Sequence, residues 1–183
     1  MVTLTLANQL TLFRLLLIPG LVILVLYGYN GWALVIFVMA GLTDALDGII
    51  ARRSGQRTSL GALLDPMADK LLFVSTFVVL SLPGLELANR IPVWLTVLVI
   101  SRDVVIVLTV AVVNLAVERR MFEPSTFGKV ATLVYILTGI VTLYFNYLAQ
   151  PSQLVTVFIY ASLVVTLLSG LHYIFYVTRV LNE

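Results

Sequence analysis

The sequence predicts an all-α, polytopic membrane protein with six transmembrane helices. Hydrophobic residues make up 61% of the chain and charged residues only 11%, and the mean hydropathy is +1.08. Soluble globular domains carry about 25% charged residues, so this composition excludes that class. A membrane crossing needs about 20 apolar residues, and 183 residues therefore leave room for five or six crossings and little else. We expect one transmembrane domain over residues 1–183.

The first three helices are predicted from apolar segments and the residues that bound them. The first segment runs from Leu10 to Leu26, with Asn8 as the expected N-cap and Pro19-Gly20 as an expected kink. The second runs from Trp32 to about Arg53, and the third from about Leu60 to Leu82. Each is long enough to cross a bilayer.

The other three helices are expected in the second half of the chain. A fourth is predicted from about Pro92 to Val117. The stretch from Val130 to Thr178 is too long for one crossing, and the turn signal Gln150-Pro151-Ser152-Gln153 divides it. The fifth helix is therefore expected to begin near Ser125 and the sixth to end near Arg179.

Basic residues are concentrated at alternate ends of the predicted helices. One side of the membrane would carry Arg52, Arg53, Arg57, Arg119, Arg120, Lys129 and Arg179. The opposite connections hold only Arg90, which Glu86 offsets. The positive-inside rule predicts that both termini and the acidic site described next lie on the cytoplasmic side. We expect a multi-pass protein of a bacterial inner (cytoplasmic) membrane.

Four aspartates lie in or beside the second and third apolar segments, and we expect them to form the active site. Asp44 and Asp47 are three residues apart, and Asp65 and Asp69 are four apart, so each pair projects from one helix face. Because the two helices are consecutive and antiparallel, the pairs can meet. Buried carboxylates need a cation, and an all-carboxylate site favours Mg²⁺ or Mn²⁺. The chain contains no cysteine, which excludes a zinc–thiolate site.

Small and basic residues flank these acids. Gly48 and Gly61 remove side chains beside the carboxylates, so that a phosphorylated group can approach the backbone. Arg52 follows Gly48 by about one helical turn and supplies a fork for phosphate oxygens. Metal, arginine and open backbone together predict a nucleotide diphosphate as ligand.

These residues resemble the signature of the CDP-alcohol phosphatidyltransferases. The matching pattern is Asp44-x-x-Asp47-Gly48-x-x-Ala51-Arg52, eight intervening residues, then Gly61-x-x-x-Asp65-x-x-x-Asp69. Two further segments are similar to the family, the second of them to its phosphatidylglycerol-phosphate and cardiolipin synthase branches. They are Asn8-x-Leu10-Thr11-x-x-Arg14-x-x-x-x-Pro19 and Pro124-Ser125-x-x-Gly128-Lys129-x-x-Thr132.

The resemblance implies transfer of a phosphatidyl group from CDP-diacylglycerol to an alcohol, with release of CMP, in phospholipid biosynthesis. It also implies two metal ions, a homodimer and no nucleic-acid partner. Asp69 is then the general base, and it shares the metal with the other three aspartates. The substrate-binding candidates are Asn8, Gly48, Ala51, Arg52, Thr58, Gly61 and, for an anionic acceptor, Arg102 and Lys129.

The acceptor alcohol stays open at this stage. We place glycerol 3-phosphate first, which would give phosphatidylglycerol phosphate. The alternative is phosphatidylglycerol, which would give cardiolipin, and the Arg102-Asp103 pair looks more like that branch. Inositol-type acceptors are less expected, given the segment around Lys129.

Each assignment has a rival without catalysis. The acids could form ion pairs with Arg14, Lys70 or Arg102 inside the bundle. A divalent-cation transporter would also place acids in a membrane, although its acids should line a path across the bilayer rather than cluster at one face. Lys129 could have no role other than extending its charge to the membrane interface. His172 is expected to be a packed residue.

Overall fold

The structure is a computed structural model that describes the backbone of residues 6–54, 59–116 and 126–182. Its description of side chains leaves out 6–8, 44–54, 59–66, 110–116, 126 and most of 176–182. The helices are α1 (Leu6–Leu26), α2 (Asn30–Ser54), α3 (Ser59–Ser81), α4 (Val93–Ala116), α5 (Thr126–Tyr147) and α6 (Gln153–Asn182). No strand occurs in these ranges, which confirms the all-α prediction.

The predicted helix boundaries agree with the observed ones to within a few residues, except at the start of α1. Asn8 lies inside α1, so its prediction as an N-cap is wrong. Leu6 and Ala7 are good helix formers, and they extend the helix beyond the capping residue. The helix also continues through Pro19.

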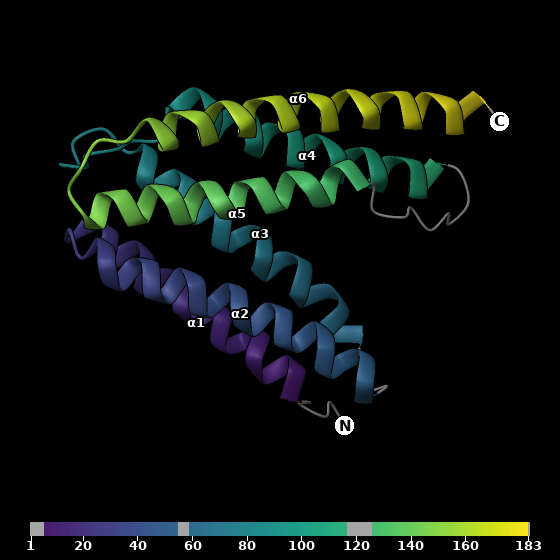
Figure 1. Ribbon diagram of the computed structural model, residues 1–183. Coiled ribbons are helices and arrows are strands. Elements are labelled where there is room, and N and C mark those ends of the chain that lie inside the picture. The colour runs from purple at the N-terminus through teal and green to yellow at the C-terminus, as the bar shows by residue number, and fades with distance from the viewer. Residues whose placement is uncertain (1–5, 55–58, 117–125, 183) are drawn as a thin grey trace.

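The six helices form two arms that spread apart toward one end of the molecule (Figure 1). Helices α1 and α2 pack together in one arm, and α4, α5 and α6 make up the other. Helix α3 runs between them and contacts α1, α2, α4 and α5. The α2–α3 junction lies at the open end of the first arm.

The arms are joined by a close-packed core. Phe73 and Phe77 of α3 pack against Tyr135 of α5, with ring centroids 5.7 and 5.8 Å apart. Phe37 of α2 lies against Gly139 of α5, where an added Cβ would be 2.9 Å from the Phe37 Cζ atom. A glycine is therefore needed for this approach of α2 to α5.

A group of hydrogen bonds around Asn89 joins the helix connections at the opposite end of the molecule. The backbone N–H of Asn89 donates to Asn146 Oδ1 at 2.7 Å, and Asn146 Nδ2 donates to the backbone carbonyl of Asn89 at 2.9 Å. Asn89 Nδ2 donates to the Gln150 carbonyl, and the Ser152 amide donates to Asn89 Oδ1. These bonds tie the α3–α4 connection to the last turn of α5 and to the α5–α6 connection.

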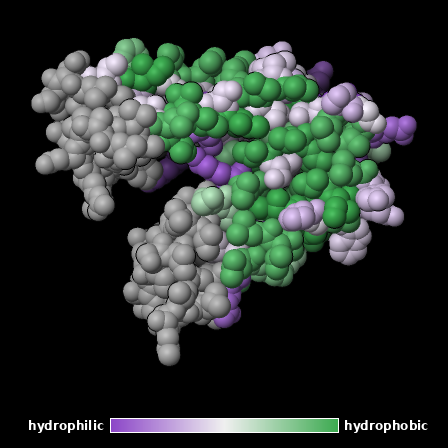
Figure 2. Space-filling model, turned by 180° about the vertical axis from the view of Figure 1, so that it is seen from behind, coloured by the Kyte–Doolittle hydropathy of each residue, from purple (hydrophilic) through white to green (hydrophobic). Residues whose placement is uncertain are grey.

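The chain is a membrane protein. In the described ranges, three segments are long and apolar enough to cross a bilayer: Gln9–Leu26, Phe127–Tyr147 and Gln153–Phe175. Hydrophobic side chains cover much of the outer surface of both arms (Figure 2). Leu16 and Phe175, for example, are 76% and 72% exposed, as expected where lipid replaces water.

Candidate active site

The backbone brings both aspartate pairs to the α2–α3 junction. Asp44 and Asp47 lie in the second half of α2, and Asp65 and Asp69 in the first half of α3. The two helices contact each other, as the prediction of consecutive antiparallel neighbours required. Of the four carboxylates, only that of Asp69 belongs to the described side chains.

The other motif positions lie on the same arm. Gly48, Ala51 and Arg52 follow on α2, Gly61 lies in the first turn of α3, and Asn8 lies in the first turn of α1. At these positions the structure describes the helical backbone but not the side chains. Thr58 lies outside the described residues altogether.

Asp69 forms an ion pair with a residue of α1. Arg14 Nη1 lies 2.5 Å from Asp69 Oδ1. The Arg14 side chain is 0% exposed, whereas that of Asp69 is 37% exposed, so the carboxylate is the accessible member of the pair. From the sequence, Arg14 is a position of the family-like N-terminal segment and a possible structural ion-pair partner, but it has no predicted role at the site. The signal that could have selected it is an arginine inside an otherwise apolar span.

A second cluster of charges joins α3, α4 and α6. Asp103 Oδ1 accepts a hydrogen bond from Arg102 Nη1 at 2.6 Å, and Asp103 Oδ2 lies 3.6 Å from the Lys70 ammonium group. Arg102 also donates through Nη2 to the Ser169 hydroxyl. The Arg102 Nε atom is buried and has no hydrogen-bond partner among the described residues. Arg102, an acceptor-binding candidate, is thus largely engaged by protein groups.

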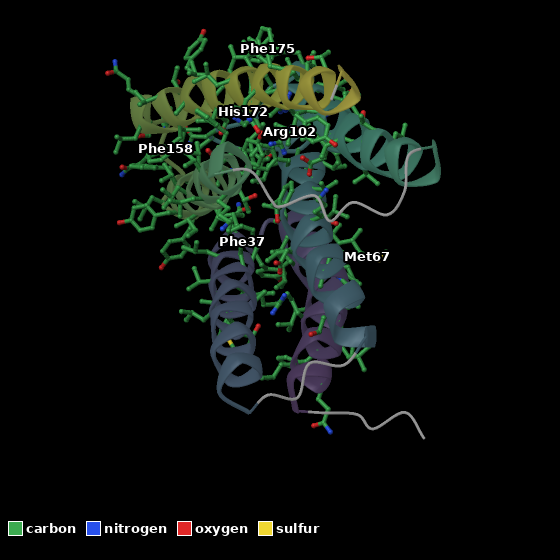
Figure 3. The ribbon with its side chains drawn as sticks, turned by 90° about the vertical axis from the view of Figure 1, so that its right-hand side faces the viewer. Phe37, Met67, Arg102, Phe158, His172 and Phe175 are labelled. Atoms are coloured by element: carbon green, nitrogen blue, oxygen red, sulfur yellow. The ribbon has the colours of Figure 1, made fainter. Side chains whose placement is uncertain are left out.

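Hydrophilic residues gather at the base of the hollow between the two arms (Figure 2). Arg102 lies between α4 and α6, and Met67 on α3 lies farther toward the α2–α3 junction (Figure 3). Lys129 is exposed in the first turn of α5. His172 contacts Phe127, with 4.7 Å between ring centroids, but its side chain is exposed, so it is less enclosed than the predicted packing role required.

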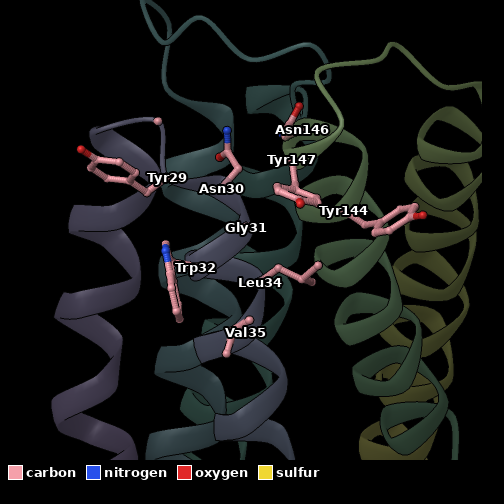
Figure 4. A pocket seen from close by; sticks show the side chains of 10 residues that line it. Tyr29, Asn30, Gly31, Trp32, Leu34, Val35, Tyr144, Asn146 and Tyr147 are labelled. Carbon is pink, nitrogen blue, oxygen red and sulfur yellow. The ribbon is translucent and has the colours of Figure 1, made fainter.

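A groove of about 630 Å³ opens at the other end of the molecule, away from the acids (Figure 4). Its lining includes Tyr29, Trp32, Tyr144 and Tyr147. An added Cβ on Gly31 would lie 2.7 Å from the Tyr147 ring, so α2 and α5 are close here. The groove contains no carboxylate, and its aromatic lining is typical of a membrane interface.

The acidic residue types on α2 and α3 are those that a hard cation prefers. Their candidate donors are all carboxylates, which suit Mg²⁺ or Mn²⁺, and the described carboxylate of Asp69 is partly accessible. Among the described side chains, no group of three or more His, Cys, Asp or Glu could hold a metal. Three of the four predicted ligands lie outside that set, so the metal stays a prediction.

The fold and the four aspartates define a helical membrane protein that carries an acidic motif on α2 and α3. The chain belongs to the CDP-alcohol phosphatidyltransferase family, whose model matches residues 4–168. It is therefore an enzyme of this family, as the aspartate motif predicted.

Similarity extends to relatives of two kinds. The chain is 35% identical over 179 residues to the probable phosphatidylglycerophosphate synthase of Mycobacterium tuberculosis, covering 92% of this chain and 79% of that protein. It is 41% identical over 126 residues to the human CMP-forming cardiolipin synthase, and the alignment covers 68% of this chain and 39% of that protein. The CMP-forming cardiolipin synthase of Streptomyces coelicolor is 36% identical over 138 residues, and the alignment covers 70% of this chain and 60% of that protein.

Proposed function

We propose that the enzyme transfers the phosphatidyl group of CDP-diacylglycerol to glycerol 3-phosphate, giving phosphatidylglycerol phosphate and CMP. The choice of acceptor rests on one observation. The chain is similar along 92% of its length to a probable phosphatidylglycerophosphate synthase. The matched cardiolipin synthases align with 68% and 70% of the chain. The reaction class rests on the family and its aspartate motif.

The second candidate is cardiolipin synthesis, with phosphatidylglycerol as acceptor. Identity to the human CMP-forming cardiolipin synthase is higher, at 41%, over the shorter aligned region. The Arg102-Asp103 sequence also favours this branch.

In the proposed mechanism, Asp69 removes the proton of the acceptor hydroxyl. The acceptor oxygen bonds to the phosphatidyl phosphorus, and the bond from that phosphorus to the CMP oxygen breaks. Bound Mg²⁺ or Mn²⁺, two ions in the family pattern, would screen the phosphoryl oxygens and stabilise the leaving CMP. Asp44, Asp47 and Asp65 would hold the metal together with Asp69.

The remaining motif residues would bind substrate. Gly48 and Gly61 leave the backbone open to the diphosphate, with Ala51 as a small residue between them, and Arg52 would bind phosphate oxygens. Asn8 and Thr58 would contact the cytidine and pyrophosphate. Lys129, which is exposed, would attract an anionic acceptor, and Arg102 would add positive charge although it bonds to Asp103 and Ser169.

We also propose six membrane crossings, with both termini and the site in the cytoplasm of a bacterial cell, and a homodimer. Arg52, Arg53 and Arg57 support this orientation, because in the sequence they cluster between the two aspartate pairs and basic connections favour the cytoplasmic side. The apolar outer surface supports the crossings.

The decisive experiment supplies purified enzyme in nanodiscs with CDP-diacylglycerol and either glycerol 3-phosphate or phosphatidylglycerol. We expect CMP release and phosphatidylglycerol phosphate with the first acceptor, loss of both in chelator, and recovery with Mg²⁺ or Mn²⁺. Cardiolipin formation with the second acceptor would select the alternative. Full activity in chelator, or no CMP from either acceptor, would overturn the proposal.

A further inference from the structure

Arg14 occupies a core position of α1 that normally holds an apolar residue. Every third or fourth residue of this helix is buried: Thr11, Arg14, Ile18, Leu21 and Val25 have exposures of 0%, 0%, 7%, 0% and 1%. This spacing defines the stripe along which a helix packs against its neighbours. A charged group there carries a desolvation penalty that an aliphatic side chain would avoid.

The ion pair at this position is asymmetric. Arg14 is completely enclosed, whereas its partner Asp69 is 37% exposed at a separation of 2.5 Å. The guanidinium group is enclosed where α1 packs on α3, whereas the carboxylate is partly accessible. Such charge-assisted hydrogen bonds are short and directional, so they restrict the carboxylate to few orientations.

We infer that Arg14 is a positioning residue that orients Asp69 for proton transfer. At 0% exposure, Arg14 is too enclosed to contact a lipid substrate, and its ion pair with Asp69 links it to the proposed base. This inference rests on the proposed function, in which Asp69 is the base. It assigns to α1 a part in the reaction besides its contribution to the bundle.

The test is a double-mutant cycle between the two residues. Arg14→Met removes the charge at similar length, Arg14→Lys keeps the charge without the planar fork, and Asp69→Asn removes the proposed base. In the otherwise unchanged enzyme, we expect Arg14→Met to lower kcat by about 10- to 100-fold. KM for CDP-diacylglycerol should change little, and Arg14→Lys should recover part of kcat.

The informative comparison is made in the Asp69→Asn background. If Arg14 acts through Asp69, adding Arg14→Met there should cause almost no further loss of kcat per folded molecule. Gel filtration and thermal unfolding in detergent would give the folded fraction of each variant. Arg90→Met is the matched control, because Arg90 is exposed and its guanidinium bonds to the Leu85 carbonyl at the other end of the molecule.

Two results would refute the inference while leaving the proposed function intact. One is an unchanged kcat in folded Arg14→Met. The other is an equal fold-loss from Arg14→Met in both backgrounds, which is what a purely structural role predicts. Failure of the proposed function is recognised separately, because the unmodified enzyme would then release no CMP, and the inference would fall with it.

Discussion

Asp69 and Lys70 are consecutive residues of α3, yet their side chains pair with helices on opposite sides. Asp69 pairs with Arg14 of α1, and Lys70 pairs with Asp103 of α4. One turn of α3 thus links α1 of one arm to α4 of the other. The two arms are therefore held together by charge as well as by apolar packing.

The first prediction compares the two members of the Lys70–Asp103 pair. Asp103 is 8% exposed and also accepts the Arg102 hydrogen bond, so Asp103→Asn should cost about 2–3 kcal/mol of unfolding free energy. The Lys70 side chain is 42% exposed and 3.6 Å from its partner, so Lys70→Met should cost at most about 1 kcal/mol. Reversible unfolding in mixed micelles measures both. Equal losses would show that the Arg102 bond adds nothing.

The second prediction separates the base from the metal ligands. Asp69→Asn keeps the volume but cannot accept the hydroxyl proton, so CMP release should fall about a hundredfold or more while CDP-diacylglycerol still binds. Asp44→Asn should lose binding first, and excess Mg²⁺ should partly restore it. The readout is a metal titration of CMP release per folded molecule.

Counting folded molecules matters here because Asp69→Asn also removes the charge opposite buried Arg14. If excess metal rescues Asp69→Asn as well as Asp44→Asn, Asp69 is mainly a ligand. The base must then be sought elsewhere.

The third prediction concerns Arg52. If its guanidinium binds the diphosphate, Arg52→Ala should weaken use of CDP-diacylglycerol by roughly 1–3 kcal/mol in kcat/KM. Arg53→Ala is a natural control, since the neighbouring arginine lies outside the motif. Steady-state kinetics at saturating acceptor measures the difference. Unchanged kinetics would assign Arg52 to membrane orientation alone.

The fourth prediction tests the contact that joins the arms. In Gly139→Ala, the new Cβ would lie 2.9 Å from Phe37 Cζ, and we expect about 1–3 kcal/mol of destabilisation. Gly41→Ala is the control, because its added Cβ would meet no described residue within 4 Å apart from its own stretch of helix. Thermal unfolding in detergent should show a lower midpoint only for Gly139→Ala. Adding Phe37→Leu should recover part of the loss, and failure to do so would mean that the strain lies elsewhere.

The sequence alone was sufficient for the all-α class, the helix boundaries and the family. These depend on composition, on runs of apolar residues and on a contiguous motif, all of which are local properties. Its one local error, the N-cap at Asn8, arose because a capping residue does not stop a helix from extending through Leu6 and Ala7. The metal and substrate roles of the motif residues stay predictions.

Only the tertiary structure decided which charges pair. Arg14 and Asp69 are 55 residues apart in the chain, and their contact exists because α1 packs on α3. The Arg102–Ser169 bond likewise requires α4 to pack on α6, and it turns a substrate-binding candidate into a residue largely engaged by its own protein. Hydropathy identifies a buried charge but not its partner, because the partner is set by how two helices pack against each other.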